Sequence, residues 1–146
     1  CLRVGPEFGM RAIRVPWEPL PPAGAAWGDR LAQLALAPWV ARLRRKLRRA
    51  GLRTHDFVLG LRDSGRMDEA RVLELVSALP DGIGELYFHL ATRSDPELLR
   101  HAPGYRFEAE LAAALSPRVR AALERGGVER LGFSDLPEDS PDPLAS

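Results

Sequence analysis

Arg14, Asp56 and His89 each lie where a predicted strand ends, and together they offer a guanidinium, a carboxylate and an imidazole. The carboxyl ends of parallel strands meet at one edge of a sheet, and α/β folds build their sites there. If the strands are adjacent, these side chains converge on one site that can bind polar groups and move a proton near neutral pH. A lone histidine at a strand end is also commonly a neutral, hydrogen-bonded structural residue, and the sequence leaves both interpretations open.

The segment from Gly84 to Arg93 reads as a short strand that runs directly into a loop. Alternate residues of a strand face opposite sides. This alternation places Leu86, Phe88 and Leu90 on one face, and Glu85, Tyr87 and His89 on the other. The first face suits packing under helices, so the second is expected to present the imidazole at the sheet edge.

A chain of 146 residues with 45% hydrophobic and 28% charged residues is long enough for one domain with a sizeable core. The net charge of +1 gives no overall field toward nucleic acid or membrane. The single cysteine excludes an internal disulfide, and no apolar run reaches the length of a bilayer span. The residues after Cys1 resemble the end of a helix, so we expect this chain to be the carboxyl-terminal part of a longer protein.

Strands and helices alternate along the predicted chain, which is typical of βαβ units with a parallel sheet. We therefore expect an α/β fold, a parallel-stranded partial β/α barrel over residues 1–136, with a flexible tail at 137–146. The predicted strands are Arg11–Pro16, Leu52–Thr54, the segment from Gly84, and Val128–Phe133. The predicted helices are Asp29–Ala50, one capped by Asp68, one capped at Ser94–Asp95, one marked by Phe107, Leu111 and Leu115, and one restarted at Ser116–Pro117. A long loop is expected from Trp17 to Gly28.

The predicted helix Asp29–Ala50 carries an apolar stripe of Leu36, Trp39 or Val40, Leu43 and Leu47. Most other positions in its last turns are basic: Arg42, Arg44, Arg45, Lys46, Arg48 and Arg49. These cations form either a solvated outer face or a surface that contacts anions or membrane headgroups. No aromatic residues interrupt the basic run, which argues against nucleic acid. Trp27 and Trp39 favour the membrane among the functional interpretations.

Self-contained catalytic motifs are absent from the sequence. It has no glycine-rich phosphate loop, no paired-cysteine metal site, no His-Glu-x-x-His and no Gly-x-Ser-x-Gly. The three histidines, His55, His89 and His101, lie too far apart to show metal-ligand spacing.

Several segments nevertheless resemble, in order and spacing, the YdjC-like carbohydrate deacetylases of the ChbG/HpnK group, with the closest similarity to the branch associated with hopanoid biosynthesis. They are Gly9–Pro16, Gly51–Asp56 through Gly60, Asp63–Gly65, Glu85–His89 with Ala91–Arg93, Glu110–Leu111, Leu115–Pro117 and Gly132–Leu136. The family usually has proline after the strand-end histidine, where this chain has Leu90.

The resemblance implies an N-deacetylase that depends on a divalent metal, Mg²⁺ or Zn²⁺, and acts on an acetylated amino sugar of a hopanoid glycolipid precursor. It implies His89 as general acid and Arg14 as a catalytic residue that orients His89 through a carboxylate or binds sugar hydroxyls. Asp56, Arg93 and Tyr87 are the implied substrate contacts. The metal-binding Asp and two His are expected before Cys1, so this chain alone is expected to hold no metal ligands and to be inactive.

The implied location is cytoplasmic, peripheral on the inner membrane face. The alternative is a non-catalytic α/β module that binds anions or a membrane surface with the basic helix segment 42–49.

Overall fold

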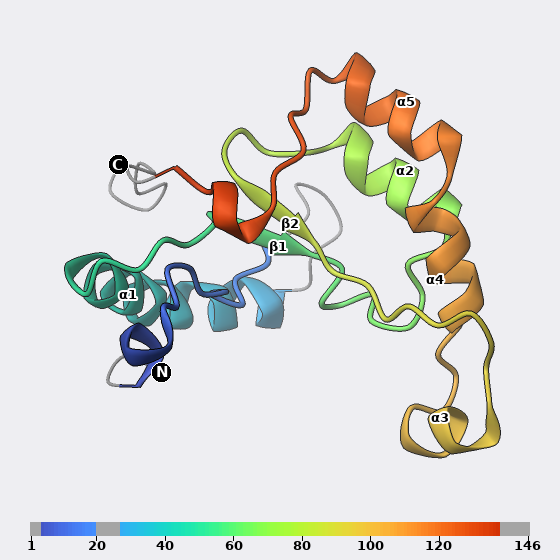
Figure 1. The fold of residues 1–146 in the computed structure, drawn as a ribbon, viewed down its shortest axis with the longest axis horizontal. Helices are drawn as coiled ribbons and strands as arrows, with labels where there is room; N and C mark the ends of the chain where they lie inside the picture. The colour runs from blue at the N-terminus through green and yellow to red at the C-terminus, as the bar shows by residue number, and fades with distance from the viewer. Residues whose placement is uncertain (1–3, 20–26, 138–146) are drawn as a thin grey trace. The chain divides into compact units, whose positions relative to one another are not determined.

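The computed structural model describes residues 4–19 and 27–137 (Figure 1). Within these ranges the fold is mixed α/β, which confirms the predicted class, with five α-helices, two parallel strands and two 3-10 helices. In chain order the elements are η1 (Gly5–Phe8), α1 (Trp27–Arg49), β1 (Phe57–Leu59), α2 (Glu69–Ser77), β2 (Gly84–Leu86), α3 (Pro96–His101), α4 (Phe107–Ala114), α5 (Pro117–Arg125) and η2 (Phe133–Asp135). The middle of the predicted loop 17–28, and the predicted tail apart from Pro137, lie outside the described residues.

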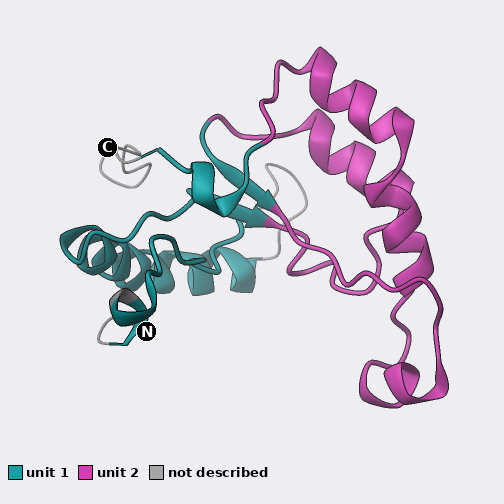
Figure 2. Ribbon diagram, viewed as in Figure 1, with its two compact units in different colours: residues 1–58, 82–85, 131–146 teal, residues 59–81, 86–130 magenta. Residues whose placement is uncertain are grey.

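The chain divides into two compact units (Figure 2). Unit 1 comprises residues 1–58, 82–85 and 131–146, and unit 2 comprises residues 59–81 and 86–130. Each unit is described by itself below. The prediction of one domain over residues 1–136 stays a prediction.

Strands β1 and β2 pair in parallel, and α2 connects them along the chain in the order that a βαβ unit requires. The Asp56 N–H donates to the Ile83 carbonyl at 2.7 Å, and the Tyr87 N–H donates to the Leu59 carbonyl at 2.9 Å. The predicted strand at Leu52–Thr54 is reduced to a single parallel bridge at Arg53, and the regular strand β1 begins at Phe57, with all three of its residues buried. Asp56 therefore precedes a strand instead of ending one.

The predicted strand Arg11–Pro16 is an extended segment with a single parallel bridge, between Ala12 and Arg53. Pairing ends where the Trp17 N–H turns back to the Val15 carbonyl at 2.7 Å. Pro16 lies at the centre of this three-residue turn, which its fixed φ of about −65° suits. Arg14 thus lies on the carboxyl side of the bridge, without a regular strand around it.

The prediction of a strand at Val128–Phe133 is wrong. The backbone is irregular up to Gly132 and then forms η2. Val128 and Leu131 are exposed, and no strand of the described ranges pairs with this segment. An alternating pattern specifies a strand only where a sheet buries one face, and this segment lacks that burial.

The predicted N-caps are confirmed at three helices, where the side chains of Asp68, Asp95 and Ser116 accept backbone N–H groups of the first turns of α2, α3 and α5. Gly126 is the C-cap of α5, as its place in the sequence predicts. These local signals act within one turn of chain, so they can be read without knowledge of the fold.

Helix α1 confirms the predicted helix and begins two residues earlier, at Trp27. Val40 and Leu47 are buried and Leu43 packs beside them in the core of unit 1. Leu36 and Trp39, the remaining members of the predicted stripe, are 55% and 70% exposed. The inward-facing stripe is therefore shorter than the sequence pattern indicates.

Each unit has its own core. The core of unit 1 consists of Val15, Val40, Leu47 and Leu52, and that of unit 2 of Met67, Val72, Ala113 and Val119. Leu86 and Phe88 pack against the core of unit 2 as the alternation predicts, whereas Leu90 is 50% exposed.

Gly60 and Gly104 are loop glycines of unit 2 that differ in how closely other atoms approach them. Both have positive φ, but a Cβ on Gly60 would lie 2.7 Å from the Tyr87 carbonyl oxygen, whereas a Cβ on Gly104 meets nothing within 4 Å. We expect Gly104→Ala to lower the free energy of unfolding by about 1 kcal/mol, and Gly60→Ala by roughly 2 kcal/mol more because of the added clash. Urea titrations of both variants measure the difference; equal losses would show that the close approach carries no cost.

Candidate active site

In unit 1, Glu85 of β2 joins Arg14 and His55. Arg14 Nε donates to Glu85 Oε2 at 2.8 Å, and a second guanidinium nitrogen pairs with Oε1. His55 Nε2 lies 3.2 Å from the same Oε2. We call Arg14, His55 and Glu85 the Glu85 cluster. The bidentate pairing fixes the plane of the Arg14 guanidinium.

His55 is only 2% exposed, and its ring meets Phe133 edge-on with 6.0 Å between centroids. Burial lowers the pKa of the imidazole; Glu85 opposes this shift, and Arg44 and Arg14 add to it. His55 is therefore uncharged near neutral pH. A ring so buried is poorly placed to exchange protons with a substrate.

Asp56 has a structural role in unit 1. Its Oδ2 accepts the Ile83 N–H at 2.8 Å, and a Cβ on Gly82 would lie 2.7 Å from that oxygen. Its backbone carbonyl accepts from the buried Arg44 guanidinium. Because Asp56 is 8% exposed and holds the turn before β2, the carboxylate beside Arg14 is Glu85 and not Asp56.

In unit 2, His89 follows β2 and lies between two tyrosines. Its ring meets Tyr87 at 4.7 Å and Tyr105 at 4.9 Å between centroids, both edge-on. The side chain is 27% exposed, and Nδ1 has no hydrogen-bond partner among the described residues. With Glu110, these residues form what we call the His89 cluster.

Glu110 of α4 is fully buried and holds the backbone of His89. Its Oε2 accepts the His89 N–H at 2.5 Å and lies 3.9 Å from His89 Nδ1. Its Oε1 accepts the Met67 N–H at 3.1 Å, so one carboxylate anchors two loops. The imidazole thus combines a fixed backbone, two aromatic neighbours and partial access to solvent, which suits a proton donor.

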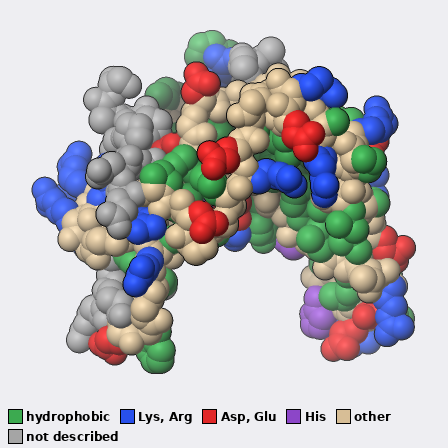
Figure 3. All heavy atoms as spheres, turned by 45° about the horizontal axis from the view of Figure 1, so that its top comes forward, with side chains coloured by type: hydrophobic (Ala, Val, Ile, Leu, Met, Phe, Trp, Pro, Cys, Tyr) green, Lys and Arg blue, Asp and Glu red, His purple; other side chains and the backbone are tan. Residues whose placement is uncertain are grey.

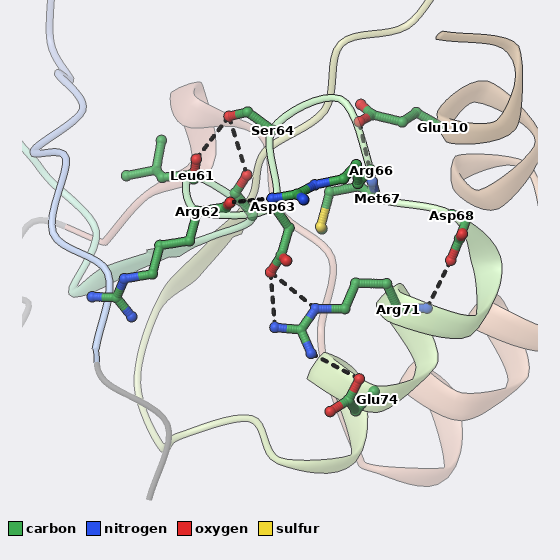
Figure 4. Close-up of polar contacts among 11 residues, drawn as sticks. Leu61, Arg62, Asp63, Ser64, Arg66, Met67, Asp68, Arg71, Glu74 and Glu110 are labelled. Atoms are coloured by element: carbon green, nitrogen blue, oxygen red, sulfur yellow. Dashed lines mark hydrogen bonds and ion pairs between the residues drawn. The ribbon is translucent and has the colours of Figure 1, made fainter. Parts of the chain in front are cut away.

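The loop Asp63–Gly65 helps to place Tyr105. Arg71 binds Asp63 through Nε at 2.9 Å and Glu74 through Nη1 at 2.7 Å, as Figure 4 shows. Gly65 has φ 78°, and a Cβ there would lie 2.4 Å from the Tyr105 ring. Glycine at this position therefore lets the ring pack against the loop.

The other predicted site residues lie as follows. Tyr87 borders His89, and Arg93 is exposed in the loop that follows. On α1, Arg42, Arg45, Lys46, Arg48 and Arg49 are exposed. Arg44 is 1% exposed, so its expected place among the surface cations is wrong; its position on the inward face of α1 directs it to the Asp56 carbonyl.

Sequence reasoning missed His55, Tyr105 and Glu110 as members of these clusters and gave Glu85 no role. Only Glu85 could have been found from the sequence, because the strand alternation places it on the same predicted face as Tyr87 and His89. The others come from segments whose proximity no local pattern shows.

Within residues 4–19 and 27–137, no three His, Cys, Asp or Glu side chains gather closely enough to hold a metal ion. The resemblance expects the metal ligands before Cys1, so this finding leaves that expectation untested, and we derive no step through a metal. No helix in these ranges is long and apolar enough to cross a bilayer.

The described residues define a mixed α/β protein in which His89 follows the parallel strand β2. A family model described as YdjC-like protein matches residues 1–125, and the chain belongs to this family. The family is of the carbohydrate deacetylase type, which supports a general hydrolase role. Neither the curated proteins nor the solved structures contain a match.

His55 makes the stability of the protein depend on pH. The unfolded chain binds the imidazole proton near pH 6.5, whereas the folded chain binds it only at lower pH, so acidification favours unfolding. We expect the wild type to lose up to about 1.4 kcal/mol per pH unit below about pH 6.5 relative to His55→Gln. Urea titrations from neutral to mildly acidic pH measure this, with His101→Gln on the surface as control. Parallel curves for wild type and His55→Gln would contradict the assignment.

Glu110 and Glu108 provide a matched pair on α4, because each accepts loop N–H groups but only Glu110 is buried. We expect Glu110→Ala to cost about 3–5 kcal/mol and Glu108→Ala about 0.5–1 kcal/mol of unfolding free energy. Glu110→Gln keeps one acceptor oxygen and should lie between them. Thermal and urea unfolding measure the losses, and equal effects of the two alanine variants would refute the anchoring role.

Proposed function

We propose that the protein is a carbohydrate N-deacetylase that removes the acetyl group from an amino sugar and depends on a divalent metal, Mg²⁺ or Zn²⁺. The observation that carries the proposal is the family match over residues 1–125, which includes Arg14 and His89. The described side chains gather no ligand set, so the metal ligands would come from outside the described residues.

His89 is the proposed general acid. Hydrolysis of an amide requires a proton for the departing amine, and a positioned imidazole supplies one near neutral pH. Its anchored backbone and 27% exposed side chain support this role. The buried, uncharged His55 is less suited to it.

Arg14, Tyr87 and Arg93 are the proposed sugar contacts. Glu85 orients the Arg14 guanidinium, which is 41% exposed, and a guanidinium is a type of donor that suits sugar hydroxyls. A role for Arg14 in orienting His89 through a carboxylate is part of the sequence resemblance and stays a prediction.

On the basis of the sequence resemblance, we place the amino sugar on a hopanoid glycolipid precursor. The enzyme would act on it from the cytoplasm, at the inner membrane face. The framework we propose is a partial β/α barrel, for which the parallel β1–β2 pair and the parallel Ala12–Arg53 bridge are the support. The alternative is a non-catalytic module that binds through the basic part of α1.

His89→Gln in the full-length protein is expected to lower kcat by roughly 10²–10⁴-fold, with KM changed only a few fold, because it removes a proton donor and not a binding group. Acetate release from N-acetylglucosamine glycolipid and from soluble N-acetylglucosamine oligosaccharides, with Mg²⁺ or Zn²⁺ supplied, measures this. His101→Gln serves as the surface control.

Three further outcomes separate the alternatives. Unchanged turnover in His89→Gln would remove His89 from the mechanism while leaving the deacetylase. No acetate release by the wild type with either metal and either substrate would favour the binding module, and a preference for the soluble oligosaccharide would refute the hopanoid substrate.

A further inference from the structure

The outward face of α1 changes in character along the helix. Val40, Arg44 and Leu47 are buried and define the inward side. In the first half, outward positions carry exposed apolar side chains, with Trp27 82%, Leu31 63% and Leu34 70% exposed. In the last turns, the outward positions carry exposed cations: Arg42, Arg45, Lys46 and Arg49.

Helical spacing puts the two groups on one continuous face. Trp27, Leu31 and Leu34 recur at intervals of four and three residues, as do the outward cations that follow. With 23 residues, α1 extends over about 34 Å, so an apolar half and a cationic half lie end to end on this face. We call it the outer face of α1.

The apolar half has no function in the core of unit 1, which Val40 and Leu47 supply from the opposite side of the helix. Soluble monomers rarely expose contiguous apolar patches of this kind unless another surface covers them. Trp39, also on α1, is 70% exposed. The composition of the apolar half therefore points to a binding surface.

The cationic half identifies the chemistry of what covers it. Within the described ranges, no ion pair involves Arg42, Arg45, Lys46 or Arg49. On the face drawn in Figure 3, acidic and basic side chains are interspersed, in agreement with a net charge of +1. An anionic surface would thus be attracted by this local set and not by the protein as a whole.

We propose that the outer face of α1 docks on the surface of a bilayer that contains anionic lipid. Trp27, Leu31 and Leu34 enter the boundary between headgroups and acyl chains, while the four cations contact lipid phosphates. A second copy of the chain would bring the same cations, and a nucleic acid would leave the apolar half exposed. This inference rests on α1 alone and does not depend on the catalytic assignment.

The test uses the purified full-length protein and sedimentation with vesicles of phosphatidylcholine, with or without phosphatidylglycerol. We expect binding to the anionic vesicles only, weakening as salt rises. Arg42→Glu with Arg45→Glu should reduce partitioning at least about 10-fold. Arg120→Glu with Arg125→Glu, which makes the same charge change on exposed positions of α5, should leave it unchanged.

The apolar half is tested separately. Trp27→Ser with Leu31→Ser should also reduce partitioning about 10-fold while keeping the salt dependence, because the cations remain. In a background of Trp17→Phe with Trp39→Phe, the emission of Trp27 should shift to shorter wavelength on anionic vesicles. Circular dichroism confirms that each variant is folded.

Three results would overturn the proposal. They are equal binding to neutral and anionic vesicles, unchanged partitioning of both α1 variants, and an emission of Trp27 that vesicles do not alter. Sedimentation equilibrium tests whether a second copy of the chain occupies this face instead. If the wild type is a dimer that does not bind vesicles, and Trp27→Ser with Leu31→Ser converts it to a monomer, the face belongs to a second copy.

Discussion

A carboxylate fully removed from water must be surrounded by donors, and in unit 2 this constraint falls on Glu110. It accepts backbone N–H groups from Met67, before α2, and from His89, after β2. Unpaired, such a group costs several kcal/mol, so α4 can pack here only if both loops present their donors. The position of the His89 backbone is therefore a condition of folding for unit 2, and Tyr87 and Tyr105 restrict the ring that it carries.

In unit 1, the carboxylate of Glu85 is compensated by a cation instead of by backbone N–H groups. The Arg14 guanidinium neutralises Glu85, so the carboxylate does not need a protonated His55, and burial together with Arg44 keeps that imidazole uncharged. His55 is 2% exposed, whereas the side chain of His89 is 27% exposed. A group that exchanges protons with a substrate must be reached by it, which is why the catalytic assignment falls on His89.

The sequence predicted what local chemistry decides: the mixed α/β class, the caps at Asp68, Asp95 and Ser116, and the amphipathic helix α1. It predicted the strand at Gly84, which is β2, but failed at Leu52–Thr54 and Val128–Phe133, because three-residue strands carry little periodicity and an apolar alternation specifies a strand only beside a neighbouring strand. The pairing of Arg14 with Glu85 joins residues 71 apart, and that of His89 with Glu110 joins residues 21 apart. Periodicity reports which face a residue occupies, but not which distant residue meets it.

One short segment contributes Glu85 to one cluster and His89 to the other, and its backbone is anchored at nearly every second position. A Cβ on Gly84 would lie 2.2 Å from the Phe57 ring, so glycine allows β2 to approach β1 closely just before Glu85. Two residues later the Tyr87 N–H bonds to Leu59, and after two more the His89 N–H bonds to Glu110. Such spacing leaves little freedom to the residues between the anchors. The proposed proton donor therefore needs no rearrangement of its own backbone before it acts, which is what preorganisation of a catalytic group requires.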